Sequence, residues 1–179
     1  FLNDNQITKL NSMLEFVTSY ITVQQGTIFI DNNDFYIKDI FQSKYRSYFE
    51  DGNGLSDEQI SQIKQLLDNK ISCKLVISPQ CQIAQQKNNG KVMVLPCIII
   101  EKNDFINCNK LFEKYLPKEI YYENSFKYFL IQLDLATYID INYINKDNFL
   151  FNISESEMHV ISDEYASFTS KKGLLKLNK

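Results

Sequence analysis

The sequence predicts an α+β fold made of two consecutive units, residues 1–104 and residues 105–179. Three observations support this prediction: a capped amphipathic helix over 56–70, two apolar runs that follow it, and further helical patterns upstream. The chain has 179 residues, of which 44% are hydrophobic, so it is long enough to bury two small cores.

Residues 56–70 are expected to form a helix. Ser56 and Gln59 stand three positions apart, as in a capping box, where each side chain bonds the backbone N–H of the other residue. Apolar residues then recur at the helical period, at Ile60, Ile63, Leu66 and Leu67. The opposite side of this helix presents polar residues, namely Gln62, Gln65 and Asn69.

Residues 71–77 and 92–100 are expected to form two strands of an antiparallel ribbon. The polar run 85–91 separates them and contains Asn89-Gly90, a pair that tolerates positive φ and favours a tight turn. Pro79 and Pro96 lack a backbone N–H, so each is expected at a strand edge, a bulge or a strand end.

Upstream of this ribbon, residues 4–24 and 37–49 have helical spacing, and residues 27–30 form a short β-branched run. Residues 35–37 offer an alternative second strand for a hairpin with 27–30. The preferred order is helix, strand, helix, helix, strand, wing, strand. This order is the winged helix-turn-helix arrangement, which we expect for the first unit.

The second unit is expected to repeat helices followed by a hairpin, as a degenerate winged helix. Helices are predicted over 108–116, 118–123 and 125–137, and a hairpin is predicted between 139–144 and 149–153. Ser154 or Ser156 is expected to cap a last helix. Its inward side would be formed by Met158, Ile161, Tyr165 and Phe168.

The residues give little support for catalysis or for a metal site. His159 is the single histidine, and the four cysteines form no C-x-x-C pair, so we expect buried thiols and no zinc site. Residues 49–60 resemble a calcium loop but lack its first Asp and its last Glu. We therefore expect no catalytic residue, no metal and no cofactor. No apolar run reaches the roughly 18 residues that a membrane span needs, so no membrane association is expected.

The charge pattern favours a protein partner over a nucleic acid. There are 19 basic and 22 acidic residues, and the helix over 56–70 begins with Asp57-Glu58, which would repel phosphates. Aromatic residues are abundant, at 13%, and Tyr and Phe are favoured at interface centres. We expect docking on the outer face of the first hairpin and on the 62–69 side of the helix. The candidate partner-binding residues are Gln62, Gln65, Asn69, Lys87, Lys91, Tyr121 and Tyr122.

The element order resembles the C-terminal tandem winged-helix region of the Stn-type subunit of CST telomere complexes. That subunit is similar to the middle subunit of replication protein A. The resemblance covers nearly the whole chain as an order of elements, without shared residue motifs. It implies a nuclear, non-enzymatic module that docks other protein subunits of a telomerase or replication complex. A tandem winged-helix adaptor of endosomal sorting or transcription machinery, and a DNA-binding winged helix, are the alternatives.

Overall fold

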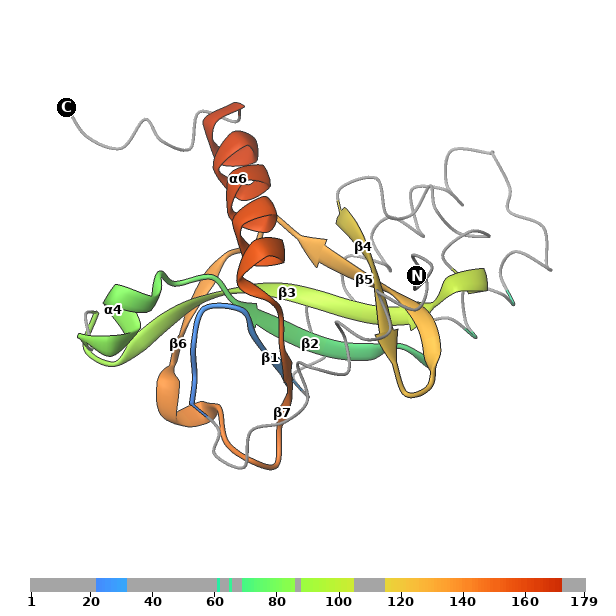
Figure 1. The fold of residues 1–179 in the computed structure, drawn as a ribbon, viewed down its shortest axis with the longest axis horizontal. Helices are drawn as coiled ribbons and strands as arrows, with labels where there is room; N and C mark the ends of the chain where they lie inside the picture. The colour runs from blue at the N-terminus through green and yellow to red at the C-terminus, as the bar shows by residue number, and fades with distance from the viewer. Residues whose placement is uncertain are drawn as a thin grey trace, which may run out of the picture.

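The computed structural model describes residues 22–31, 69–85, 88–104 and 115–171, together with the single positions Ser61 and Gln65. These residues form a mixed α+β fold around a curled antiparallel sheet of seven strands (Figure 1). The predicted α+β class is therefore confirmed. The helices predicted over 4–24 and 37–49, and most of the helix over 56–70, lie outside the described residues.

The elements follow one another along the chain. The strands are β1 (Thr27–Ile30), β2 (Ile71–Val76), β3 (Lys91–Glu101), β4 (Tyr115–Tyr122), β5 (Ser125–Gln132), β6 (Thr137–Asp140) and β7 (Phe149–Asn152). The described helices include α4 (Gln80–Ala84), the 3-10 helix η2 (Ile141–Tyr143) and α6 (Glu155–Lys171). The sheet order is β4-β5-β3-β2-β1-β7, and β6 also pairs with β3.

The β2–β3 ribbon lies at the centre of the sheet, and it confirms the predicted antiparallel pair. Its register runs from Ile71 opposite Ile99 to Val76 opposite Val94. The short helix α4 lies between the two strands and was not predicted. The turn before β3 has positive φ at Asn89 (55°) and at Gly90 (74°), as the Asn-Gly pair predicted.

Strands β5 and β6 behave as one strand that is interrupted opposite Pro96. Both pair with the same edge of β3, and residues 133–136 separate them. The Ile77 N–H donates to the Met93 oxygen (2.9 Å), so the polar backbone groups of Met93 face β2. Because these groups alternate along a strand, those of Pro96 face the interrupted edge. The N–H that Pro96 lacks would therefore point to the gap between β5 and β6, where β3 has no paired strand. Pro79 directly precedes α4, after the end of β2, as predicted.

Two predicted helices of the second unit are strands. Residues 118–123 belong mostly to β4 and residues 125–132 form β5, joined by a two-residue turn with positive φ at Glu123 and Asn124. Residues 129–132 of β5 are buried on both faces, so Phe129, Leu130 and Ile131 follow one another without alternation. The helix predicted over 108–116 lies outside the described residues, except that Tyr115 and Leu116 begin β4.

The predicted hairpin of 139–144 with 149–153 is also wrong in its pairing. Residues 149–152 form β7, but of the first predicted strand only residues 139 and 140 belong to β6, and residues 141–143 form η2. Strand β6 pairs with β3, and β7 pairs with β1. The last helix is confirmed. The Ser154 hydroxyl accepts the Glu157 N–H (3.3 Å) at the start of α6.

The strands do not separate into two sheets at the predicted boundary between residues 104 and 105. That boundary falls between β3 and β4, yet β3 pairs with β5 and β1 pairs with β7. If the two predicted units were separate, the backbone N–H and C=O groups along the edges of β3 and β1 would be unpaired. Pairing β3 with β5, and β1 with β7, gives those groups hydrogen-bond partners. The described strands of residues 27–152 thus form one continuous sheet.

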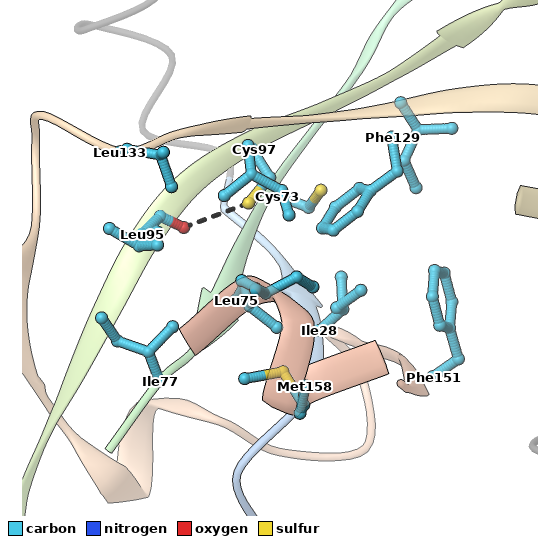
Figure 2. Packing of buried hydrophobic residues seen from close by; sticks show 13 residues of the cluster. Ile28, Cys73, Leu75, Ile77, Leu95, Cys97, Phe129, Leu133, Phe151 and Met158 are labelled. Carbon is cyan, nitrogen blue, oxygen red and sulfur yellow. Dashed lines mark hydrogen bonds between the residues drawn. The ribbon is translucent and has the colours of Figure 1, made fainter. Parts of the chain in front are cut away.

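Helix α6 stands on one face of the sheet, with its C-terminal end pointing away from it (Figure 1). Side chains alternate between the two faces of a strand, so the apolar residues form separate clusters. The cluster under α6 brings together Ile28, Cys73, Leu75, Cys97, Phe129, Met158 and Ile161, among others (Figure 2). A cluster on the opposite face contains Phe29, Val76, Ile83, Val92, Val94 and Ile144. The described sheet is therefore covered on both sides.

Candidate interaction surface

Among the described residues, the predicted partner-binding residues Lys91, Tyr121 and Tyr122 do not share one surface. Gln62 and Lys87 lie outside the described residues, while Gln65 and Asn69 are helical and exposed. Lys91 is exposed at the first position of β3, where it is opposite Asp140. Tyr121 and Tyr122 end β4, beside the other end of β3. The 11 residues of β3 span roughly 33 Å, so Lys91 is far from both tyrosines.

In the described part of the chain, the first hairpin lies in the middle of the sheet, and docking on its outer face stays a prediction. Strand β2 pairs with β1 and β3, and β3 pairs with β2, β5 and β6. Most of their side chains are buried, including Leu75, Leu95 and Ile98, each 0% exposed. Sequence periodicity could not show this, because the covering strands come from distant parts of the chain.

The end of the β4–β5 hairpin combines aromatic and charged side chains. We call it the hairpin-end surface. It is defined by Glu101, Lys102, Glu119, Tyr121, Tyr122, Glu123, Phe126 and Lys127. The two-residue turn at Glu123 and Asn124 sets the register, because positive φ at both positions matches the twist of the flanking strands. The turn places Tyr121 opposite Phe126 and Tyr122 opposite Ser125.

The three aromatic rings of this surface lie on both faces of the hairpin. Tyr121 and Phe126 make an edge-to-face contact, with ring centroids 5.1 Å apart at 73°. Tyr122 is on the opposite face, where its ring centroid is 5.6 Å from that of Phe151. All three rings of the surface are partly buried, so each is held in place and still reaches the surface.

Lys127 is almost buried beneath two exposed glutamates. Its side chain is 10% exposed, and its Nζ lies 3.1 Å from Glu101 and 3.0 Å from Glu123. The same Nζ lies 5.6 Å from the centre of the Tyr122 ring. Burial lowers the pKa of Lys127, but the hydrogen bonds to Glu123 and Glu101 outweigh it and raise the pKa. The ammonium group therefore stays charged and holds the hairpin end against β3.

The charge that reaches solvent on this surface is mostly negative. Glu101, Glu119 and Glu123 have side chains 50%, 41% and 57% exposed. Lys102, 2.7 Å from Glu119, is 45% exposed. Nearby, burial and then the charge of Glu101 raise the pKa of Asp104, as expected where carboxylates are crowded. A partner would therefore meet three carboxylates and one ammonium group among these residues.

Sequence reasoning identified Tyr121 and Tyr122 but missed the charges beside them. Glu101 directly follows the strand predicted over 92–100, and Lys127 falls within the helix predicted over 125–137. The available signal was the Glu123-Asn124 pair between two strand-like runs, because Asn tolerates the positive φ of a hairpin turn. The structure also exposes Tyr138, at 54%, on β6 at a distance from the hairpin end.

A second polar cluster joins β1, β2 and η2. Lys74 Nζ lies 2.7 Å from Asp31, and both side chains are largely buried, at 14% and 7% exposed. The Tyr143 hydroxyl donates to the same carboxylate (3.3 Å), and its ring contacts Phe29 edge-on. Burial and then the Asp31 charge raise the pKa of Tyr143. This cluster fastens η2 to the sheet and has a structural role.

The described residues contain neither a metal-binding cluster nor a helix fit to cross a membrane. Among the described residues, no three side chains of His, Cys, Asp or Glu are arranged to hold a metal ion. None of the helices in the described ranges has the length and apolar character that a membrane crossing requires.

A scan against protein-family models, a search of curated proteins and a search of solved structures each found no match.

Proposed function

We propose that this chain is a non-enzymatic protein-interaction module that binds a partner through the hairpin-end surface. The supporting observation is the combination of partly buried aromatic rings, at Tyr121, Tyr122 and Phe126, with exposed carboxylates around them. Protein interfaces commonly have aromatic residues at their centre and a polar, charged rim.

The partner segment is expected to be both basic and apolar. Carboxylates outnumber ammonium groups on this surface, which favours Lys or Arg on the partner and disfavours a polyanion such as DNA. A basic side chain of the partner would meet the exposed carboxylates of Glu101, Glu119 and Glu123, since Lys127 itself already lies over the Tyr122 ring. Apolar side chains of the partner would then cover Tyr121 and Phe126.

A more specific form of this proposal is a subunit of a nuclear telomerase- or replication-associated complex, similar to the Stn-type subunit. It is motivated by the order expected from the sequence for the first unit, in which helices precede the β2–β3 ribbon; the strands of residues 115–152 do not follow that order. An adaptor of endosomal sorting or transcription machinery remains the alternative. The identity of the stably co-purifying subunits distinguishes these forms, because each predicts a different complex.

The proposal is tested by quantitative affinity purification of the full-length protein. One variant, Tyr121→Ala with Phe126→Ala, removes the aromatic pair at an expected stability cost of about 0.5–1.5 kcal/mol beyond lost burial. A second, Glu119→Gln with Glu123→Gln, removes exposed charge and keeps the side-chain shape. Tyr138→Ala is the matched control, because Tyr138 is exposed and distant.

We expect both double variants to lose the same bound proteins and Tyr138→Ala to retain them, with thermal unfolding showing that each variant is folded. Retention of all partners by the folded charge variant and the folded aromatic variant would refute the proposed surface. Strong, salt-dependent retardation of oligonucleotides by the isolated chain would favour the DNA-binding alternative.

A further inference from the structure

The turn that leads into β3 has a reactive sequence in an exposed position. Asn88, Asn89 and Gly90 have φ of 64°, 55° and 74°, and the Lys91 N–H donates to the Asn88 oxygen (3.1 Å). Positive φ at both central residues, Asn89 and Gly90, defines a type I′ turn. Both asparagine side chains are exposed.

Gly90 leaves the backbone nitrogen after Asn89 open to approach. A Cβ built on Gly90 would meet no described atom within 4 Å, so the space beside its Cα is open. An asparagine side-chain amide lies close enough in the chain to form a five-membered ring with the next backbone nitrogen. Glycine is the residue that hinders such ring closure least, because it has no side chain.

We propose that Asn89 is a site of spontaneous deamidation through a succinimide, with water as the co-reactant. The Gly90 nitrogen loses its proton to solvent base and bonds to Asn89 Cγ. The bond from Cγ to the side-chain nitrogen breaks, and this nitrogen takes a proton and leaves as ammonia. Water then opens the ring. Attack at Cγ gives aspartate, and attack at the Asn89 backbone carbonyl carbon gives isoaspartate.

The folded turn controls the rate of this reaction. In the left-handed conformation of Asn89, the Gly90 nitrogen points away from the Asn89 side chain, so ring closure needs the turn to open. Opening breaks the bond from Lys91 to Asn88, and it strains the bond in which the Ile141 N–H donates to the Gly90 oxygen (2.9 Å). The site therefore reports local opening at the start of β3 and at η2.

The product changes the contacts of this end of the sheet. Isoaspartate adds a methylene to the backbone and a carboxylate beside Lys91, which is opposite Asp140 on β6. The longer backbone cannot keep both the type I′ turn and the Ile141 bond in their present geometry. We expect η2 to loosen from the turn after conversion.

The test is peptide mass spectrometry of the intact full-length chain after incubation in mildly alkaline buffer, with and without denaturant. Conversion adds about 1 Da at the modified residue. Asn88 is the internal control, because it is exposed with positive φ but is followed by Asn89 instead of glycine. Gly90→Ala is the matched variant, and it is compared with the wild-type chain in denaturant, because an alanine strains the left-handed backbone of the folded turn although its Cβ meets no described atom within 4 Å.

We expect conversion at Asn89 in the folded chain, faster conversion in denaturant and no conversion at Asn88. In denaturant, we expect several-fold slower conversion at Asn89 in Gly90→Ala than in the wild-type chain. In denaturant, the other Asn-Gly pair, Asn53-Gly54, should convert at a rate similar to Asn89. No mass gain at Asn89 in the folded chain, while Asn89 converts in denaturant, would overturn the proposal. Equal conversion at Asn88 and Asn89, or equal conversion of Gly90→Ala and the wild-type chain in denaturant, would overturn the succinimide route.

Discussion

Cys73 and Cys97 are directly opposite each other on β2 and β3, and both side chains are buried beneath α6 (Figure 2). The hydrogen bond from the Ile77 N–H to the Met93 oxygen shows that the backbone polar groups of Met93 face β2. Because these groups alternate along a strand, the backbone N–H and C=O groups of Cys73 and Cys97 face each other, as in a hydrogen-bonded pair of an antiparallel sheet. The Cys97 thiol donates to the Leu95 oxygen (3.3 Å). Burial raises the pKa of both thiols, and Asp31 adds to the effect at Cys73.

These thiols should make the protein less stable at alkaline pH. Their folded pKa is raised, so above the unfolded thiol pKa of about 8.5 the folded state holds more protons than the unfolded state. Their contribution is therefore complete below about pH 8.5 and falls as pH rises, by up to about 1.4 kcal/mol per pH unit for each thiol.

Urea unfolding of the wild-type chain and of Cys73→Ala with Cys97→Ala, at pH 7 to 10, measures this contribution. The variant should lose stability at pH 7 through lost packing and show a flatter dependence on pH above 8.5. If the free energy of unfolding of the two proteins fell equally with pH above 8.5, the alkaline loss of stability would not come from these thiols.

The ion pair between Lys74 and Asp31 should matter far more than the one between Lys102 and Glu119. Lys74→Met leaves a largely buried carboxylate without its ammonium partner, and removing one member of a buried pair costs about 3–5 kcal/mol. Lys102→Met removes an exposed pair worth about 0–1 kcal/mol. Chemical unfolding of both variants measures the difference, and comparable losses would show that burial does not decide the effect here.

Gly26 and Gly90 both have positive φ but differ in their surroundings. A Cβ at Gly26 (φ 93°) would lie 2.9 Å from Met158 Cγ and 3.1 Å from the Ile153 oxygen, whereas a Cβ at Gly90 meets no described atom within 4 Å. Both alanine variants incur about 1–2 kcal/mol for the left-handed backbone. Gly26→Ala adds roughly 1–3 kcal/mol of overpacking. Thermal unfolding should therefore give Gly26→Ala a clearly lower melting temperature than Gly90→Ala. Equal melting temperatures would refute the close packing of Gly26 against Met158 and Ile153.

Sequence patterns correctly predicted the elements that depend on interactions between residues close together in the chain. The start of α6 could be predicted from Ser154, and its inward side from the spacing of Met158 and Ile161. The β2–β3 ribbon followed from two apolar runs around Asn89-Gly90. These features depend on capping, helical period and turn chemistry, which neighbouring residues determine.

The remaining errors arise where tertiary packing decides the structure. Phe126, Phe129, Leu130 and Leu133 have helical spacing, but residues 129–132 of β5 are buried on both faces, which gives a short continuous apolar run. Pro117 suggested the end of a helix, whereas it lies within β4, paired with β5 at Leu130. The partners of β6 and β7 are β3 and β1, and no turn signal between Asn145 and Asn148 encodes those distant pairings.

The same limit applies to the hairpin-end surface. Tyr121 and Tyr122 stood out as part of an aromatic cluster, and the structure places both at the end of β4. Lys127, Glu101 and Glu123 come together only because β5 pairs with β3, opposite Glu101. Their ion pairs could therefore not be predicted from sequence spacing.

Strand β1 has consequences for how the protein is made. One edge pairs with β2 and the other with β7, so the Thr27 hydroxyl bonds Asn152 across 125 positions of the chain. On the ribosome, the β7 side of β1 therefore waits for its partner until residues 149–152 have been translated. Nascent chains and fragments that stop before residue 149 lack that strand, and we expect them to be held by chaperones or to aggregate through this edge.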